Sequence, residues 1–343
     1  MKFNFVIGNP PYQEETVGEQ KTFAPPIYHK FIDEAYKVAD CVELIHPARF
    51  LFNAGNTPKD WNKAMLSSPH LKVKFYEHDS SKVFANTEIK GGVAITYYDG
   101  KKDFGEIGIF TPYQELNDIL QKVRRMSSNS FSEIVVSRTA YRLTDLMHHD
   151  HPEAAAQLSN GHLYDMSTNI FDRLPQIFFN ESPADGYSYV RILGRTNNER
   201  VYKYIRRNYV NTVVNLESYK IFLPSANGNG LLGETLSMPI ISEPGVGATE
   251  TFVSIGTFQT RQEAENTLKY IRSKFSRVLL GALKVTQHIT PEKWKYVPLQ
   301  DFTPASDIDW SKSVAEIDRQ LYAKYGLDEK EIEFIETHVK EMV

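Results

Sequence analysis

The first 100 residues alternate between apolar runs and segments with helical spacing. The apolar positions over 27–39 recur at the interval of one helix face and predict a helix, and 61–66 shows a second helical segment. Apolar or alternating runs predict strands over 3–8, 41–45, 71–76 and 91–98. We expect the strand over 3–8 to be buried, because it is a nearly continuous apolar run. This order predicts an α/β fold that contains part of a doubly wound sheet.

A polar run, Ser127 to Ser130, predicts a linker between a first domain over 1–126 and a second domain over 127–343. The second domain contains β-like runs over 187–193, 201–205, 213–216, 220–223 and 251–255. Helical patterns cover 145–157, 262–280, 313–325 and 328–339. We therefore expect a mixed α+β second domain.

The composition excludes several classes of protein and of binding site. Of 343 residues, 41% are hydrophobic and 24% are charged, as in ordinary soluble globular proteins. The net charge of −4 gives no overall basic field, so any contact with nucleic acid needs a local patch. A lone cysteine, Cys41, excludes an internal disulfide framework and a multi-cysteine metal site, and it fits a reducing cytoplasm. No apolar run is long enough to predict a membrane span.

The most informative motif is Asn9-Pro10-Pro11-Tyr12, which follows the first predicted strand. The prolines fix φ and cannot extend a strand or a helix, so this segment is a rigid corner at a sheet edge. The Asn9 amide oxygen and a proline carbonyl are then stiff acceptors beside an aromatic ring. Such a corner suits a planar group that carries an NH2, such as an adenine swung out of a duplex.

The run from Phe5 to Tyr12 resembles the catalytic motif of adenine-specific DNA amino-methyltransferases, in particular the large methylase-plus-specificity chains of bacterial restriction-modification systems. The segments 45–51 and 82–93 resemble the elements that follow this motif in the family. The second domain resembles the family's target-recognition domain, on the runs 219–223, 251–257 and 297–299. The resemblance therefore implies double-stranded DNA as the partner and S-adenosyl-L-methionine as the cofactor.

The resemblance also implies roles for individual residues. Asn9 and Pro10 would accept hydrogen bonds from the adenine amine, Pro11 would stiffen the corner, and Tyr12 would stack on the flipped base. Phe84 would supply the second stacking face, with a plain core position as the alternative.

The cofactor-binding half of the family precedes this motif, and only eight residues precede Asn9 here. We expect an incomplete methyltransferase: a truncated product, an expression fragment, or one part of a split enzyme with a partner chain supplying the missing half. The run from Gly228 to Gly233 spells G-x-G-x-x-G, but Pro239 leaves no room for a following helix, so we expect a loop.

Two rival interpretations involve metal ions. Asp79 with Glu88 and Lys90 resembles a metal-dependent nuclease site, although it falls inside the segment that matches the methylase. The histidines at 148, 149 and 151 read better as a solvated face, and no metal site is predicted.

Two basic clusters are candidates for DNA contact. Lys122, Arg124 and Arg125 precede the predicted linker. A larger set is interleaved with tyrosines, which suits phosphate contact and base stacking: Arg191, Arg195, Arg200, Lys203, Arg206 and Arg207. A solvated helix face is the alternative for this set. A non-catalytic DNA-binding specificity module, completed by a partner chain, is the alternative for the whole protein.

Overall fold

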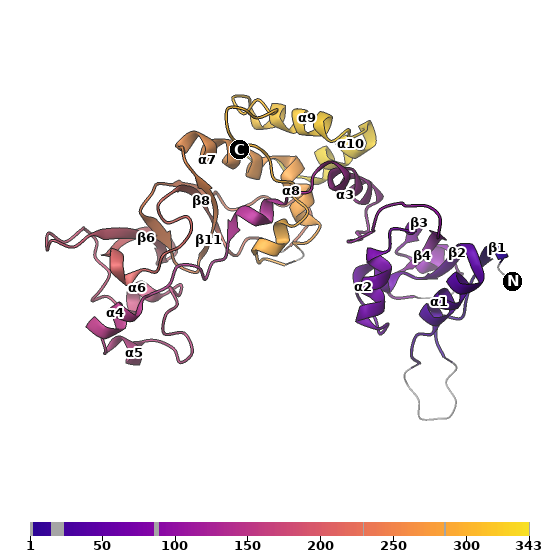
Figure 1. The fold of residues 1–343 in the computed structure, drawn as a ribbon, viewed down its shortest axis with the longest axis horizontal. Coiled ribbons are helices and arrows are strands. Elements are labelled where there is room, and N and C mark those ends of the chain that lie inside the picture. The colour runs from indigo at the N-terminus through magenta and orange to yellow at the C-terminus, as the bar shows by residue number, and fades with distance from the viewer. Residues whose placement is uncertain (1–2, 15–23, 86–88, 229, 285, 343) are drawn as a thin grey trace. The chain divides into compact units, whose positions relative to one another are not determined.

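The computed structural model describes residues 3–14, 24–85, 89–228, 230–284 and 286–342. The chain divides into two compact units, Met1–Gln121 and Lys122–Val343 (Figure 1). The sequence predicts this boundary between residues 126 and 127. The helix α3, Gln114–Met126, runs through the division.

The first unit contains one four-stranded sheet in the order β1-β2-β4-β3. Its elements are β1 (Phe3–Gly8), α1 (Tyr28–Val38), β2 (Ala39–Pro47), α2 (Lys59–Ser67), β3 (Leu71–Glu77) and β4 (Val93–Asp99), with 3₁₀ turns at Ala48–Phe52 and Ser80–Lys82. The predicted helices and strands of this unit are confirmed. β1 and β2 are parallel, whereas β4 is antiparallel to both β2 and β3. The sheet is therefore mixed.

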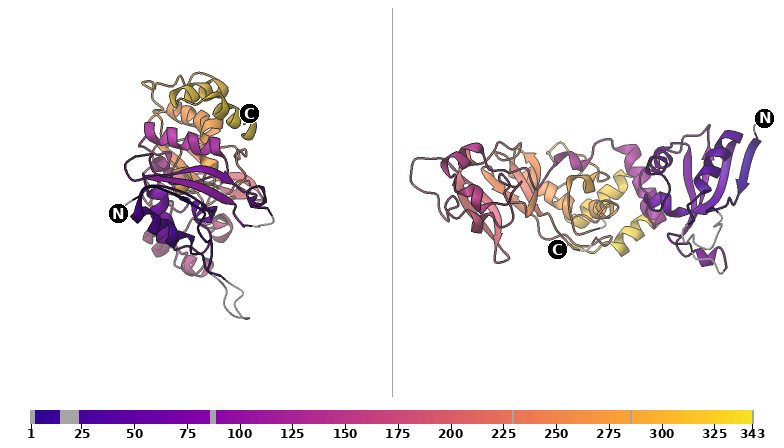
Figure 2. Two further views of the ribbon diagram at one scale, coloured as in Figure 1. Left: turned by 90° about the vertical axis from the view of Figure 1, so that its right-hand side faces the viewer. Right: turned by 90° about the horizontal axis from the view of Figure 1, so that it is seen from below.

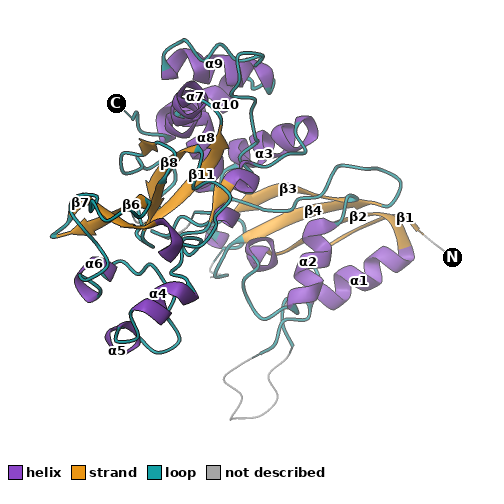
Figure 3. Cartoon of the chain, turned by 60° about the vertical axis from the view of Figure 1, so that its left-hand side comes forward, coloured by secondary structure: helices purple, strands orange, loops and turns teal. Residues whose placement is uncertain are grey.

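The core of the first unit lies on one face of this sheet. Val42 and Leu44 of β2 and Ala94 of β4 pack with Ile32 and the rest of the apolar face of α1. Alternate strand residues point to opposite faces, so every second residue of β2 joins this core. Figure 3 shows α1 and α2 on the same side of the sheet.

The expectation of a buried first strand is wrong. β1 lies at the edge of the sheet, as the right-hand view of Figure 2 shows. Phe3, Phe5 and Ile7 are 58%, 47% and 76% exposed, and only Val6 of the strand packs against the core. A nearly continuous apolar run is typical of a strand whose two faces are both covered. β1 has such a run, but among the described residues no element covers its second face.

The second unit contains two further sheets, in the orders β10-β6-β7 and β5-β11-β8-β9. Its strands are β5 (Val135–Val136), β6 (Tyr189–Thr196), β7 (Glu199–Arg206), β8 (Tyr219–Pro224), β9 (Ile240–Ser242), β10 (Val246–Ala248) and β11 (Phe252–Phe258). Its helices are α4 (Asp145–Asp150), α5 (Ala154–Gln157), α6 (Ile170–Arg173), α7 (Arg261–Arg272), α8 (Lys274–Gly281), α9 (Val314–Lys324) and α10 (Glu329–His338). Three 3₁₀ turns cover Phe131–Ile134, Arg207–Tyr209 and Pro291–Trp294. No helix within the described ranges has the length and apolar composition needed to cross a bilayer.

Three sequence expectations for the second unit are wrong. The run 213–216 forms a turn, because Asn215 is buried there and accepts a hydrogen bond of 2.7 Å from Tyr141 Oη. The predicted helix over 262–280 is divided at Ser273, whose hydroxyl caps α8. The predicted helix over 145–157 is divided into α4 and α5 by the residues 151–153. The predicted linker contacts the second unit, since Phe131 N donates to the Val297 carbonyl over 2.8 Å and Leu299 N to the Asn129 carbonyl over 3.0 Å.

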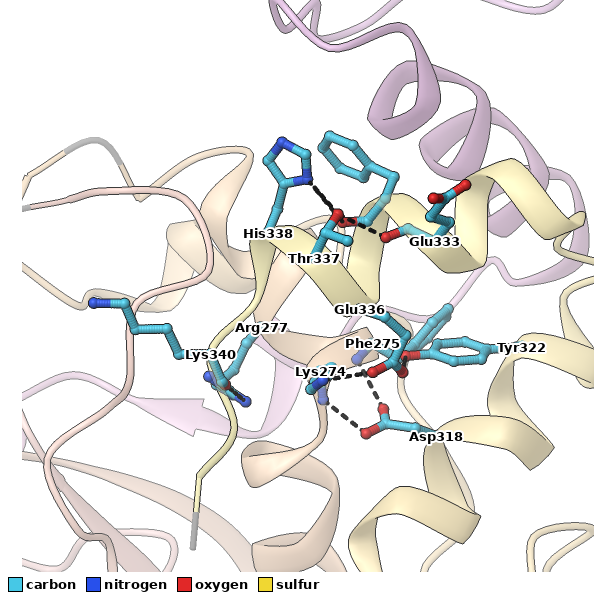
Figure 4. Close-up of polar contacts among 11 residues, drawn as sticks. Lys274, Phe275, Arg277, Asp318, Tyr322, Glu333, Glu336, Thr337, His338 and Lys340 are labelled. Carbon is cyan, nitrogen blue, oxygen red and sulfur yellow. Dashed lines mark hydrogen bonds and ion pairs between the residues drawn. The ribbon is translucent and has the colours of Figure 1, made fainter.

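The start of α8 is held by a carboxylate from α9. Asp318 accepts hydrogen bonds from the backbone N–H groups of Lys274 and Phe275, at 3.0 and 2.9 Å (Figure 4). Tyr322, one turn further along α9, donates to Glu336 of α10 over 2.9 Å. Burial raises the pKa of Asp318 to about 6, even though the two amides favour its charged form. These bonds join α8, α9 and α10.

Candidate adenine site and nucleic-acid surface

The Asn9-to-Tyr12 corner directly follows the carboxyl end of β1. Asn9 and Pro11 are exposed, and Pro10 and Tyr12 are half-buried. The chain returns beside the corner, where Ile27 N donates to the Tyr12 carbonyl over 3.2 Å. The corner is therefore accessible and is fixed at both ends, by β1 and by the start of α1.

The two predicted stacking residues lie together. The ring centroids of Tyr12 and Phe84 are 6.4 Å apart, and the ring planes meet at 65° in an edge-to-face contact. Because stacked bases are spaced about 3.4 Å apart, a base held between two rings needs parallel planes about 7 Å apart. The spacing of the two rings is close to this requirement, and their angle does not meet it.

The Tyr12 hydroxyl is buried and has no hydrogen-bond partner among the described residues. Burial raises the pKa of Tyr12 to about 12, so the phenol stays neutral at physiological pH. An unpaired hydroxyl is a cost to the fold.

Phe84 is placed by a short 3₁₀ turn, in which Phe84 N donates to the Ser80 carbonyl over 2.8 Å. Asp79 caps this turn by accepting from Ser81 N and Oγ, at 3.1 and 2.6 Å, and these bonds lower its pKa. Glu88, the other carboxylate of the rival nuclease motif, lies outside the described residues. The described geometry makes Asp79 a capping residue.

His46 and Thr96 support the end of β2, a contact that sequence reasoning missed. His46 is fully buried, its Nε2 lies 2.8 Å from Thr96 Oγ1, and its ring is stacked on Tyr28 at 5.8 Å. Burial lowers the pKa of His46 to about 4, so the ring is neutral. Its signal in the sequence was a histidine directly after the predicted strand over 41–45.

The glycine-rich run from 228 to 233 is a loop, as expected, and no helix follows it over 230–239. Gly233 has φ of +71°, and a Cβ there would lie 2.2 Å from the His338 carbonyl oxygen. Glu234 turns back into the loop and pairs with the buried Lys284. Asn229 lies outside the described residues. The glycines therefore serve local packing, and the run does not fit a nucleotide cradle.

Two histidines of the predicted solvated face, His149 and His151, have local acidic or phenolic partners. His149 lies 3.1 Å from Asp150, and His151 lies 3.3 Å from Glu153 and 3.4 Å from Tyr209 Oη. The part of the chain that the structure describes contains no group of three or more His, Cys, Asp or Glu residues that could hold a metal ion.

The larger basic set lies on or just beyond the β6–β7 hairpin, rather than on a helix. Its turn is Asn197-Asn198, with φ of 50° and 65°. Five of the six members bind protein groups: Arg191 pairs with Glu243, Arg200 donates to the Met238 carbonyl, Lys203 donates to Asn180, Arg206 pairs with Asp185, and Arg207 pairs with Glu217.

Arg195 is the exposed member beside the hairpin turn, and it lies directly opposite Arg200 across the two strands. Like charges in this position are unfavourable. Burial lowers the pKa of Arg200, and the charge of Arg195 lowers it further. An anion placed between the two guanidinium groups would relieve this repulsion.

One part of the chain matches a known protein family. Residues 1–84 match the model of the Eco57I restriction-modification methylase family. An adenine-specific methylase of Mycoplasma pneumoniae, described as uncharacterized, is 30% identical over 95 residues, which cover 27% of this chain. Residues 1–84 therefore match a restriction-modification methylase family, and part of the chain is similar to an adenine-specific methylase. The resemblance predicted from the Asn9-to-Tyr12 motif is confirmed.

The chain spans 22% of the length of the Mycoplasma pneumoniae methylase. It also aligns with the type IIG restriction endonuclease BpuSI, with a TM-score of 0.28 at 10% identity, covering 84% of this chain and 43% of that one. The alignment with the type IIL restriction-modification enzyme MmeI has a TM-score of 0.33 at 9% identity. It covers 98% of this chain and 56% of that one. TM-scores this low define no shared fold.

Proposed function

We propose that this chain carries the adenine-positioning corner and the DNA-recognition part of an adenine-specific DNA methyltransferase of a restriction-modification system. One observation carries the proposal. The Asn9-to-Tyr12 corner is open at the carboxyl end of β1, within the segment that matches the family, and the Phe84 ring lies against Tyr12.

The corner acts by positioning and by electrostatics. Asn9 Oδ1 and the Pro10 carbonyl accept hydrogen bonds from the adenine amine, which localises the nitrogen lone pair and aims it at a methyl donor. Because the amine itself is the nucleophile, no covalent intermediate with the protein forms. The Tyr12 and Phe84 rings hold the base, and stacking contributes about 1–3 kcal/mol per base against the cost of extrusion from the duplex.

The methyl donor implied by the family is S-adenosyl-L-methionine, and the described residues do not fit its main site. The one glycine-rich run follows β8 without opening a helix, and Glu234 fills it. We therefore assign donor binding to a polypeptide segment outside the described residues. This chain alone is expected to bind DNA without methylating it.

The second unit would provide sequence recognition on double-stranded DNA. The tip of the β6–β7 hairpin, beyond the pairing of β10 with residues 191–193, fits this role because a two-stranded ribbon can enter the major groove. In addition, Arg195 and Arg200 favour an anion between them. A specificity module without catalysis is the alternative, since the same hairpin would serve it equally well.

Methyl transfer tests the proposal. The chain is joined to the part of the Mycoplasma pneumoniae methylase that precedes the matched segment, and tritium transfer from S-adenosyl-L-methionine to duplex DNA is measured. Asn9→Ala should reduce transfer about 10²–10³-fold, as expected for loss of one oriented group, while DNA affinity stays unchanged. The matched control is Asn4→Ala, at an exposed asparagine of β1 outside the corner.

Transfer that is insensitive to Asn9→Ala, or methylation of cytosine instead of adenine, would refute the assigned role. DNA binding without transfer in the joined protein would favour the specificity module.

A further inference from the structure

The second unit contains a polar cavity of about 210 Å³ that the function proposed above does not use. Its wall is formed by the loop between α5 and α6, the end of α6, and the connection from β10 to β11. The lining includes one apolar side chain and several polar or charged ones: Leu158, Ser159, His162, Asp165, Arg173 and Glu250. A single buried water needs about 10–15 Å³, so the cavity can hold a larger molecule.

The cavity lies beside the base of the β6–β7 hairpin tip. β10 pairs with β6 up to Ala248 and Leu193, and Glu250 and Arg195 follow two residues later in each segment. α6, which ends at Arg173, packs against the same part of β6 (Figure 3). A nucleic acid held at the hairpin tip would therefore pass close to the mouth of this cavity.

Two opposite charges in the cavity have no charged partner among the described residues. The Arg173 side chain donates one hydrogen bond, from Nη1 to Ser159 Oγ over 2.8 Å. The Glu250 carboxylate makes neither a hydrogen bond nor an ion pair with any described residue, although it lines the same cavity as Arg173. Asp165 differs, because it is already paired with Arg142 and with an imidazole. The cavity thus offers a ligand one guanidinium group and one carboxylate.

We propose that this cavity binds a guanine base, with Arg173 at O6 and N7 and Glu250 at N1–H and the N2 amine. The fork of a guanidinium group matches the two acceptors, and the two oxygens of a carboxylate match the two donors. Cytosine and adenine each offer a single amine, and thymine offers none. The Leu158 side chain supplies apolar contact to the ring. The volume lies below the roughly 300–1,000 Å³ of pockets that enclose drug-sized ligands, which suits a base better than a whole nucleotide.

The inference rests on the proposed function in one respect, which is the source of the guanine. Because the neighbouring hairpin is the proposed DNA-recognition element, we assign the base to DNA, from which it is extruded into the cavity. A free guanine nucleotide presents the same base, and the experiment below separates the two sources.

Binding of 5′-monophosphates to the full chain tests the base preference, measured by ligand-observed saturation-transfer NMR without DNA. All these nucleotides carry the same phosphate, so differences in affinity report on the base alone. Guanosine monophosphate should bind most tightly. Inosine monophosphate, which lacks the N2 amine, should bind about tenfold or more weakly, as expected for loss of a hydrogen bond to a charged group. Thymidine monophosphate should bind most weakly.

Variants of the two charged residues assign the contacts. Glu250→Gln should weaken guanosine monophosphate about tenfold and narrow its advantage over inosine monophosphate. Arg173→Gln should weaken both nucleotides alike, because both retain O6 and N7. Arg138→Gln and Glu181→Gln, at exposed positions that do not line the cavity, are the matched controls and should change neither affinity. The inosine comparison leaves the protein unaltered, so it stands even where a variant fails to fold.

Equal affinity for all the nucleotides, no binding of any of them, or binding that survives both cavity variants would overturn the proposal. Displacement of guanosine monophosphate by glycine would overturn it in favour of an α-amino acid.

Competition with duplex DNA identifies the source of the base. Guanosine monophosphate should displace the duplex more effectively than inosine monophosphate does if the guanine belongs to DNA. A duplex that neither nucleotide displaces would assign the cavity to a free guanine nucleotide. Methyl transfer does not enter these measurements, so its failure in the joined protein would refute the proposed function alone, and loss of the guanine preference would refute the cavity alone.

Discussion

The buried hydroxyl of Tyr12 separates the contribution of the ring from that of the polar group. Tyr12→Phe keeps the edge-to-face contact with Phe84 and removes an oxygen that has no partner among the described residues. Leaving a buried polar group unpaired costs about 1–3 kcal/mol. We therefore expect Tyr12→Phe to stabilise the first unit by about 1 kcal/mol. The phenol is neutral up to pH values near its pKa of about 12, so the gain should not vary across physiological pH.

Hydrogen exchange of α1 in the full chain measures this change, because α1 and Tyr12 belong to the same core. A gain of about 1 kcal/mol slows exchange by global opening of the unit about fivefold. Faster exchange in Tyr12→Phe would mean that the hydroxyl contributes a bond to the fold, which would refute the reasoning.

The same variants test base capture. With 2-aminopurine at the target position of a duplex, extrusion of the base raises its fluorescence. Tyr12→Phe should capture the base as the parent chain does, because the ring remains. Tyr12→Ala should lose about 1–3 kcal/mol of stacking, or roughly 5- to 150-fold in affinity for the extruded base. Equal losses in both variants would assign the contact to the hydroxyl.

Two further predictions concern the second unit. The pKa of Asp318 in the fold, about 6, exceeds its ordinary value of 3.8, so its stabilising contribution is complete below about pH 4 and is lost as the pH rises through 6. The free energy of unfolding should fall by about 3 kcal/mol from this group over that range, and Asp318→Asn should remove this part of the slope in urea titrations at several pH values. Arg195→Ala should weaken DNA binding and reduce the dependence of log K on log salt by about one, whereas Arg207→Ala, at an arginine already paired with Glu217, should change the salt dependence less.

The local elements of this protein follow from its sequence. Proline restricts φ in any context, so Pro10 and Pro11 alone predict a stiff corner after the first strand. Helical spacing in 27–39 and Ser or Asp caps before α9 and α10 act within one or two turns of chain. The relation to adenine-specific methylases was readable for the same reason, since the matching motif is a contiguous run.

The tertiary structure alone decided burial, pairing and accessibility. The apolar run of β1 predicted a covered strand, and the fold leaves it at an edge, because burial depends on a neighbour that a local pattern cannot specify. Tyr12 and Phe84 are 72 positions apart in the sequence, and only the folded first unit brings their rings to 6.4 Å and sets their angle. Most of the basic set is paired with acidic or polar groups, and Arg195 is left exposed beside the hairpin turn, because strand register selects partners that sequence spacing does not reveal.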